Sequence, residues 1–331
     1  MKSFFTTLAA GAMLVAGAAQ AQDLSPAVVF DMGGKFDRSF NEGIYNGVEK
    51  FREETGISYE EFEVTNESQR EQAIRRMARN GADVVIAVGF AQAPALEAVA
   101  PDFPDTKFTI IDMVVDMPNV QSVVFKEHEG SFLVGMLAAM ASKTGGVGFV
   151  GGMDIPLIRK FACGYEQGAR HVIADIGYFE NMTGTTPAAW ADPVKGGELA
   201  RSQFDRGADV VYAAAGFTGT GVLQAAEDTG NLAIGVDSNQ NYLHPGTVLT
   251  SMLKRVDVAA YEAFKGAMDG SWSPGVKVLG LAEEGVGWAL DEHNDALVTD
   301  EMRTAVAEAR DKIIAGEIEV VDYTANNACD F

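Results

Sequence analysis

The pentapeptide GADVV at residues 81–85 returns as GADVV at residues 207–211, a displacement of 126 positions. In both copies an amphipathic helical pattern precedes the pentapeptide, and a short apolar strand begins within it. A second set of matches, displaced by 121 positions, pairs Phe40, Gly43 and Gly47 with Phe161, Gly164 and Gly168. Reuse of one pattern in any parallel sheet would explain the first match alone. Two matches at nearly one offset predict an internal duplication, and therefore two similar lobes with a cleft between them.

Outward from these repeats, short apolar runs alternate with helical patterns along the chain. The expected strands cover residues 27–30, 84–88 and 108–111 in the first half and residues 147–150, 210–214 and 232–236 in the second half. Strands that alternate with helices predict βαβ units and parallel sheets. The sequence thus predicts an α/β fold with two Rossmann-like lobes.

The N-terminus has the pattern of a cleaved secretory leader. Lys2 precedes an apolar run at 8–18, and Ala19-Gln20-Ala21 has small residues at the positions that a signal peptidase requires. We therefore expect a signal peptide over residues 1–21. The rest, about 310 residues, exceeds what one hydrophobic core usually serves. Because no cysteine lies near the cleavage point, we expect a periplasmic protein without a lipid anchor.

Cysteine content leaves one question open. Cys163 and Cys329 are the two cysteines of the chain, and in an oxidising compartment they can pair. Cys163 also falls in a helical pattern that could bury it as a free thiol. Both alternatives stay open at this point.

The net charge of the chain limits the classes of molecule that it is expected to bind. Asp and Glu number 47 against 25 Lys and Arg, for a net charge of −22. Such a chain disfavours nucleic acid and anionic membrane surfaces and suits a small neutral or cationic solute. The sequence contains neither a G-x-S-x-G elbow nor an H-E-x-x-H pair, and its four histidines are far apart. We expect no catalytic residues, no metal site and no cofactor.

Three expected strands end in a carboxylate: Asp31, Asp112 and Asp237 follow or close their apolar runs. In open α/β sheets, ligands bind outside the carboxyl ends of the strands. A carboxylate there can accept hydrogen bonds from vicinal hydroxyls, as on a ribose. Each Asp could instead cap a helix or hold a turn. Their presence in both halves favours a binding site.

Aromatic residues accompany these carboxylates. Phe36 lies in a glycine-rich loop, and Phe217 lies in the loop GFTGTG at 216–221. Rings in such loops can stack on a flat base. The loop at Gly216 lacks the spacing of a phosphate-binding loop, which predicts that its backbone approaches an uncharged ligand. Phe90 and Trp190 are interpreted as covers of the core edge.

Residues 31–41, which contain Asp37-Arg38-Ser39-Phe40-Asn41, resemble the Asp-basic-Ser-Phe-Asn signature of the basic membrane protein family, whose members are substrate-binding lipoproteins and include a purine nucleoside receptor. Further stretches agree and together span nearly the whole mature chain; they are residues 118–120, 125–135, 148–152, 234–237 and 251–255. The chain departs from the family pattern at its missing lipid-attachment cysteine and at Asn239, where many relatives have Asp.

The resemblance implies a type I periplasmic binding protein fold with a multi-crossover hinge. Its N-terminal lobe would comprise residues 22–125 and 254–283, and its C-terminal lobe residues 126–253 and 284–331. It implies a monomer that binds a purine nucleoside (adenosine, guanosine or inosine) for an ABC permease in the inner membrane.

Site residues carried over from the resemblance divide by role. Phe36 and Phe217 would hold the base, and Asn41 and Asp112 would read its edge. Asp237 and Lys254 would hold the ribose. Asp31 could join either set, with Gly216 beside the ligand.

Two other functions remain open. A sugar-binding protein would keep the strand-end carboxylates but would flank a pyranose with tryptophan, and Trp190, Trp272 and Trp288 are not expected in strand-end loops. An exported nucleoside hydrolase would show turnover.

Overall fold

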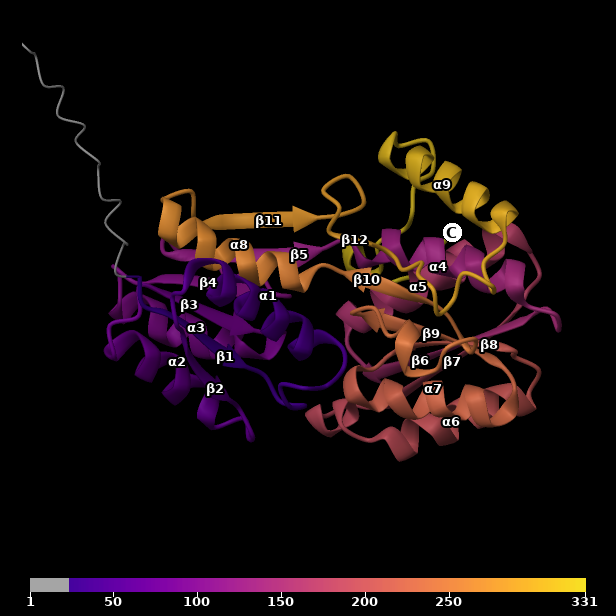
Figure 1. Cartoon of the computed structure of the whole chain (residues 1–331), viewed down its shortest axis with the longest axis horizontal. Helices are drawn as coiled ribbons and strands as arrows, with labels where there is room; N and C mark the ends of the chain where they lie inside the picture. Colours follow the sequence, from indigo (N-terminus) through magenta and orange to yellow (C-terminus); the bar gives the residue numbers. More distant parts are fainter. Residues whose placement is uncertain (1–23) are drawn as a thin grey trace, which may run out of the picture.

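The computed structural model describes residues 24–331, so the predicted signal peptide lies outside the described residues. Two lobes lie side by side, each built on a six-stranded sheet with helices packed against it (Figure 1). The late segments α8 and β11, drawn in orange, return to the lobe that holds the N-terminal part of the chain. The α/β fold with two mostly parallel sheets is confirmed.

The N-terminal sheet has the strand order β11-β5-β4-β3-β1-β2, and all its pairings are parallel. Its strands are β1 (Pro26–Phe30), β2 (Glu60–Glu63), β3 (Val84–Val88), β4 (Lys107–Ile111), β5 (Val120–Phe125) and β11 (Gly275–Leu279). The helices of this lobe are α1 (Phe40–Thr55), α2 (Gln69–Arg79), α3 (Ala93–Val99) and α8 (Val256–Asp269).

The C-terminal sheet repeats this topology with the order β12-β10-β9-β8-β6-β7. Its strands are β6 (Gly146–Met153), β7 (Gly177–Gly184), β8 (Val210–Ala214), β9 (Leu232–Asp237), β10 (Val248–Lys254) and β12 (Val286–Trp288). The helices are α4 (Glu127–Ala141), α5 (Pro156–Val172), α6 (Pro193–Asp205), α7 (Gly219–Thr229) and α9 (Asp300–Ile314). The one difference in pairing is at the edge, where β12 runs antiparallel to β10.

Alternation along the central strands divides the apolar side chains between two cores. In β1, Val28 and Phe30 face the large core that continues into the C-terminal lobe, whereas Ala27 and Val29 face a second core beneath α2 and α3. Every residue of β1 and β3 is buried. Burial on both faces explains why these strands read as unbroken apolar runs.

The glycines matched between the two halves allow equivalent helix pairs to pack closely. A Cβ atom on Gly47 of α1 would lie 2.1 Å from the carbonyl oxygen of Asp257 in α8, and one on Gly168 of α5 would lie 1.9 Å from that of Phe132 in α4. No side chain larger than hydrogen fits at such distances. The duplicated glycines thus mark the same helix contact in each lobe.

The chain passes between the lobes three times, from β5 to α4, from β10 to α8 and from β11 to β12. A disulfide joins Cys163 of α5 to Cys329 across a sequence separation of 166 residues, so the free-thiol alternative is wrong. Within residues 24–331, none of the helices has the length and apolar character that crossing a bilayer requires.

Candidate functional site

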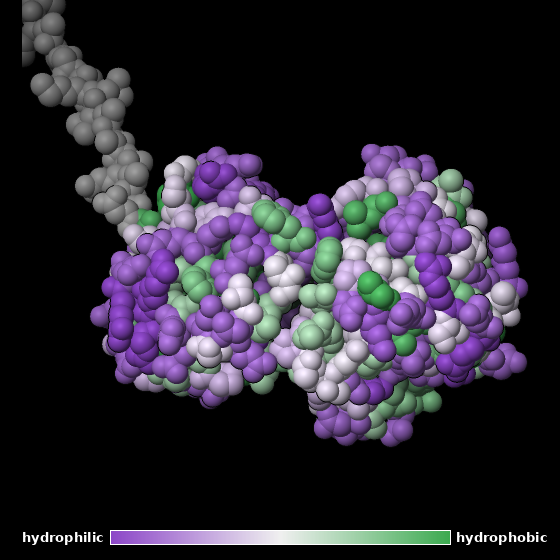
Figure 2. All heavy atoms as spheres, turned by 90° about the horizontal axis from the view of Figure 1, so that it is seen from below, coloured by the Kyte–Doolittle hydropathy of each residue, from purple (hydrophilic) through white to green (hydrophobic). Residues whose placement is uncertain are grey.

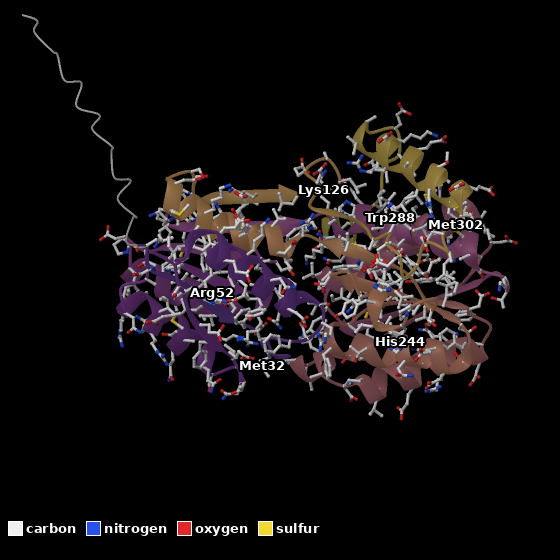
Figure 3. The ribbon with its side chains drawn as sticks, in the orientation of Figure 1. Met32, Arg52, Lys126, His244, Trp288 and Met302 are labelled. Atoms are coloured by element: carbon white, nitrogen blue, oxygen red, sulfur yellow. A yellow bond between two sulfur atoms is a disulfide. The ribbon has the colours of Figure 1, made fainter. Side chains whose placement is uncertain are left out.

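The carboxyl ends of both sheets face a shared cleft of about 630 Å³, a volume that includes solvent at its mouth. Figure 2 shows the two lobes meeting at a waist, along which pale and green, less polar residues gather. Met32, which lines the cleft, and Lys126, which lies at a chain crossing, are on opposite edges of the junction between the lobes (Figure 3). Met32 therefore marks an edge of the cleft opposite that crossing.

Most residues predicted for the site do line this cleft; they are Asp31, Asn41, Asp112, Gly216, Asp237 and Lys254. Phe36 and Phe217 are not among its lining residues. Phe36 is 58% exposed, and its ring packs edge-on against Tyr45 with 5.1 Å between ring centroids. Phe217 is 38% exposed. In this structure neither ring lines the cleft, and their role in holding the base stays a prediction.

Lys254, the last residue of β10, is the buried cation of the cleft. Its Nζ lies 2.7 Å from both carboxylate oxygens of Asp112 and 2.9 Å from Oε1 of Glu127. Three rings surround it, those of Phe40, Phe125 and Phe161, with centroids 5.1–5.4 Å away. Burial alone would lower the pKa of Lys254, but the nearby carboxylates raise it above its ordinary value. Lys254 is therefore held as a cation between Asp112 of the N-terminal lobe and Glu127 of the C-terminal lobe.

Asp112 and Asp237 occupy equivalent places, immediately after β4 and at the end of β9. Both have left-handed backbone conformations, with φ of 76° and 62°, which non-glycine residues rarely adopt. Burial raises the pKa of each to about 6, and the Lys254 cation opposes that rise. The two carboxylates are thus held at the cleft floor and are mostly ionised at neutral pH.

Asp37 is a site residue that the sequence reasoning missed. Its buried carboxylate accepts hydrogen bonds from the backbone N–H groups of Ser39, Asn41 and Glu42 at the start of α1, at 2.9–3.1 Å. It also accepts one from Nδ2 of Asn41, at 3.2 Å. Burial raises the pKa of Asp37 to about 6. Within residues 24–331 no donor reaches the buried Oδ1 of Asn41, which leaves that oxygen as an acceptor in the cleft.

Asp31 is held from behind by Arg70 of α2. The guanidinium Nε and Nη2 atoms lie 3.2 and 3.1 Å from Oδ1 of Asp31. Burial raises the pKa of Asp31 although Arg70 acts to lower it. The ion pair fixes this carboxylate at the end of β1, and no local sequence pattern announced the arginine.

Four aromatic rings line the cleft instead of the predicted pair, namely Phe40, Phe90, Phe161 and Trp190. Phe40 and Phe161 are partners in the internal match, so the duplication carried a signal that could have identified Phe161. Trp190 ends a short 3₁₀ helix (Pro187–Trp190) that follows β7. Trp190 packs against the large core, as expected for a core-edge cover, but it and Phe90 also line the cleft. The exclusion of Trp190 from strand-end loops is wrong, because it follows the end of β7.

Glycines make room for the Trp190 ring. A Cβ atom on Gly152 would lie 2.1 Å from Cζ3 of Trp190, and one on Gly216 would lie 3.7 Å from Cε3. The sequence predicted that the backbone at Gly216 approaches a ligand. In this structure the same backbone lies against the Trp190 ring. The indole lies on backbone from two strand ends, a flat surface at the C-terminal side of the cleft.

The rims of the two lobes touch across the cleft. Oγ of Ser39 donates to Oδ2 of Asp237 at 2.5 Å, and Oγ of Ser238 donates to the Ser39 carbonyl at 2.9 Å. Nε2 of Gln240 donates to the Arg38 carbonyl, also at 2.9 Å. The Ser39 segment precedes α1 and the other three residues follow or end β9, so these bonds hold the lobes together.

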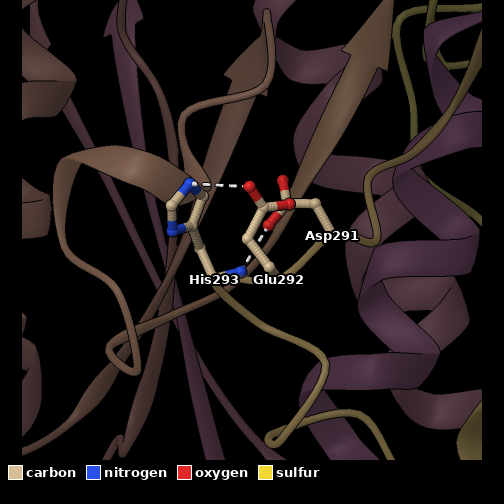
Figure 4. A group of neighbouring side chains, drawn as sticks. All are labelled: Asp291, Glu292 and His293. Atoms are coloured by element: carbon tan, nitrogen blue, oxygen red, sulfur yellow. Dashed lines mark hydrogen bonds and ion pairs between the residues drawn. The ribbon is translucent and has the colours of Figure 1, made fainter.

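Asp291, Glu292 and His293 form the only trio of potential metal ligands among residues 24–331 (Figure 4). The Asp291 carboxylate already accepts bonds from the side-chain amides of Asn239 and Asn241 and from the His293 backbone N–H. The trio follows β12 and does not line the cleft. Asn239, the departure from the family pattern, is a donor to Asp291 where an aspartate would repel it.

Comparison with known proteins identifies the family. Residues 25–324 match the family described as "ABC transporter substrate-binding protein PnrA-like". An uncharacterized lipoprotein of Pyrococcus horikoshii is 35% identical over 285 residues, which cover 82% of this chain and 70% of that protein. The ABC transporter nucleoside-binding protein BmpA of Lactococcus lactis is 32% identical, over 90% of this chain and 89% of its own length.

A solved structure agrees with these relatives. The crystal structure of an ABC transporter solute-binding protein from Aeropyrum pernix superimposes with a TM-score of 0.83 at 30% identity, covering 90% of this chain and 93% of that one. Since three Pyrococcus relatives carry lipoprotein names, the comparisons contradict the expected periplasmic protein without a lipid anchor. That expectation rested on the absence of a cysteine near residue 21, a stretch of sequence that lies outside the described residues. The chain belongs to the PnrA-like family of ABC transporter substrate-binding proteins.

Proposed function

We propose that this chain binds a purine nucleoside in its interlobe cleft and presents it to the permease of an ABC importer. The observation that carries the proposal is the pairing of a flat aromatic wall with a charged floor in one cleft. Trp190 lies on one side, and Asp112, Asp237 and Lys254 lie at the bottom. A purine nucleoside joins a flat base to a vicinal diol. The Lactococcus relative named for nucleoside binding supports the same ligand class.

The ribose would lie over the charged floor. Asp112 contacts Lys254 at 2.7 Å, so we now place it with the ribose rather than with the base edge. Asp112 and Asp237 would accept hydrogen bonds from the ribose hydroxyl groups, and Lys254 would donate to a hydroxyl oxygen. Each charge-assisted bond to a desolvated group contributes roughly 1.5–3 kcal/mol. Because these side chains come from both sheets, a ribose held by them would bridge the lobes.

The base would lie against the aromatic wall. Trp190 offers the largest flat surface, and Phe40, Phe90 and Phe161 close the remaining sides of the cleft. Stacking of a base on an aromatic side chain contributes roughly 1–3 kcal/mol. The open Oδ1 of Asn41 would accept a hydrogen bond from a donor on the base edge.

Binding would shift the population toward the closed form. The chain crosses between the lobes three times, and these crossings would act as a hinge. A ligand that contacts both lobes binds the closed form better than the open form, and this difference in affinity drives closure. The permease would then recognise the paired lobe surfaces.

A thermal-shift screen of the purified protein against nucleosides, free bases, pentoses and hexoses tests this function. A ligand at about 100 times its dissociation constant adds roughly 2.7 kcal/mol to the free energy of unfolding. We expect adenosine, guanosine or inosine to raise the unfolding midpoint while ribose alone leaves it unchanged. A response to sugars alone would exclude the nucleoside, and release of free base would reveal a hydrolase.

A second candidate ligand is a sugar, and one observation favours it. Trp190 lines the cleft beside the carboxylates, and a tryptophan next to carboxylates can also flank a pyranose. The hexose arm of the same screen decides between the two.

A further inference from the structure

Four charges of alternating sign lie in a row that begins at the cleft with Asp112 and Lys254 and continues behind it with Glu127 and Lys160. Lys254 Nζ contacts Asp112 at 2.7 Å and Glu127 Oε1 at 2.9 Å. Lys160 Nζ then contacts Glu127 Oε2 at 2.9 Å and the carbonyl oxygen of Phe125 at 3.0 Å. Glu127 is only 1% exposed, and neither it nor Lys160 lines the cleft.

The row crosses from one lobe to the other. Asp112 follows β4 of the N-terminal sheet, whereas Glu127 begins α4 and Lys160 lies in α5 of the C-terminal lobe. Glu127 and Lys254 each lie at a chain crossing, after β5 and at the end of β10. The other charged groups that influence this row are Asp237, His128 and Asp322; His128 and Lys160 lie 3.9 and 4.0 Å from the Asp322 carboxylate.

We propose that Glu127 and Lys160 are positioning residues that hold the Lys254 ammonium in place for ligand binding. Without Glu127, the ammonium has only Asp112 as a close ionic partner, and the two would satisfy one another instead of a ligand. Without Lys160, both oxygens of Glu127 would compete for Lys254 and draw it away from Asp112. The four charges together sum to zero and keep the cation between the lobes.

The reactivity of the Lys254 amine tests this arrangement without any ligand. Acetylation of each lysine is followed by mass spectrometry in the ligand-free protein and in the variants Glu127→Gln and Lys160→Met. Loss of the Glu127 carboxylate lowers the pKa of Lys254, so acetylation should be faster. Without the Lys160 cation, the carboxylates of Asp112 and Glu127 both act on the Lys254 ammonium alone. The pKa of Lys254 should then rise, and its acetylation should be slower. Each pKa unit changes the free-amine fraction about tenfold.

The two variants should change the acetylation rate of Lys254 in opposite directions if Glu127 and Lys160 position it. A fold loosened by the substitutions would instead make Lys254 more reactive in both variants. Lys265→Met is the matched control, because Lys265 lies in α8 over the Tyr261 ring and not in the charged row. It should leave the acetylation rate of Lys254 unchanged. Faster acetylation in both variants, or no change in either, would overturn the proposal.

Ligand affinity supplies the second measurement, and this part rests on the proposed nucleoside function. Calorimetric titration with inosine should show binding about tenfold weaker or worse in both variants, unchanged in Lys265→Met and largely restored in Lys160→Arg. Unchanged inosine affinity in both variants would overturn the positioning role. If the parent protein binds no nucleoside, the proposed function fails, whereas opposite acetylation changes would still support the positioning of Lys254.

Discussion

The raised pKa values of the two carboxylates in the cleft predict how nucleoside affinity depends on pH. Asp112 and Asp237 are proposed to accept hydrogen bonds from the ribose, which requires their ionised forms. Burial raises the pKa of each to about 6. Acidification from neutral pH should therefore weaken binding, although the charge of adenosine itself does not change in this range.

The size of the effect follows from the fraction of ionised carboxylate. With a pKa of about 6, one carboxylate is ionised in roughly half of the molecules at about pH 6 and in roughly one of eleven at about pH 5. Affinity should thus fall about twofold and then about tenfold for one required carboxylate. If both must be ionised, the loss approaches about a hundredfold at about pH 5.

Isothermal titration calorimetry with adenosine, in buffers of different ionisation enthalpy, measures both the affinity and the protons released. Near pH 6, binding should release protons, because the ligand selects the ionised carboxylates. Asp237→Asn is the informative variant, since it removes one titrating group and should make the pH dependence shallower. An affinity that stays constant between about pH 5 and about pH 8, or proton uptake on binding, would refute the reasoning.

The raised pKa values of Asp112 and Asp237 also affect the stability of the ligand-free protein, but there a rise in pH is unfavourable. The ordinary pKa of an aspartate is 3.8, and the folded-state value here is about 6, so ionisation disfavours the folded state. The contribution of one such group to the free energy of unfolding should fall by roughly 3 kcal/mol as pH rises from about 4 to about 6, in opposition to carboxyl groups such as Asp154 whose pKa is lowered. Urea titration of the ligand-free protein at a series of pH values measures this loss.

Three further changes have expected outcomes. Trp190→Ala should weaken nucleoside binding by roughly 1–3 kcal/mol in calorimetry, whereas Phe36→Ala should leave it nearly unchanged; equal losses would contradict the placement of these rings. Gly152→Ala should weaken binding through displacement of Trp190, whose Cζ3 would lie 2.1 Å from the new Cβ, and an unchanged affinity would argue against an indole that must lie on backbone. Replacement of Cys163 and Cys329 by serine should lower the free energy of unfolding by about 2–5 kcal/mol in urea titration, and equal stability with and without the disulfide would contradict this.

The fold could be predicted from the sequence because its central strands are buried on both faces. Such strands appear as continuous apolar runs between helical patterns, and the duplicated glycines marked equivalent helix contacts. The edge strand β11 had no comparable signal, since four of its five residues are exposed. Its place in the N-terminal sheet depends on a return of the chain, which local patterns do not encode.

The candidate site was predictable only in part. Asp112 and Asp237 could be found because the carboxyl end of a buried strand leads directly into the cleft. The aromatic wall could not be found this way, because loop geometry decides which ring turns inward: Phe40 lines the cleft, whereas Phe36, four residues earlier, packs on Tyr45. Pairs such as Asp31 with Arg70 join residues far apart in sequence and leave no local pattern.

The late return of α8 and β11 to the first lobe means that the order of synthesis differs from the order in which the sheets are completed. Until residues 275–279 have been made, β5 is an open edge of the N-terminal sheet, a feature that favours wrong pairing with other chains. Cys163 likewise cannot form its disulfide until Cys329, two residues before the last residue of the sequence, has been made. A chain truncated before β11 would therefore lack the edge strand of the N-terminal sheet and the disulfide of the C-terminal lobe. We expect such fragments to aggregate rather than to fold as separate lobes.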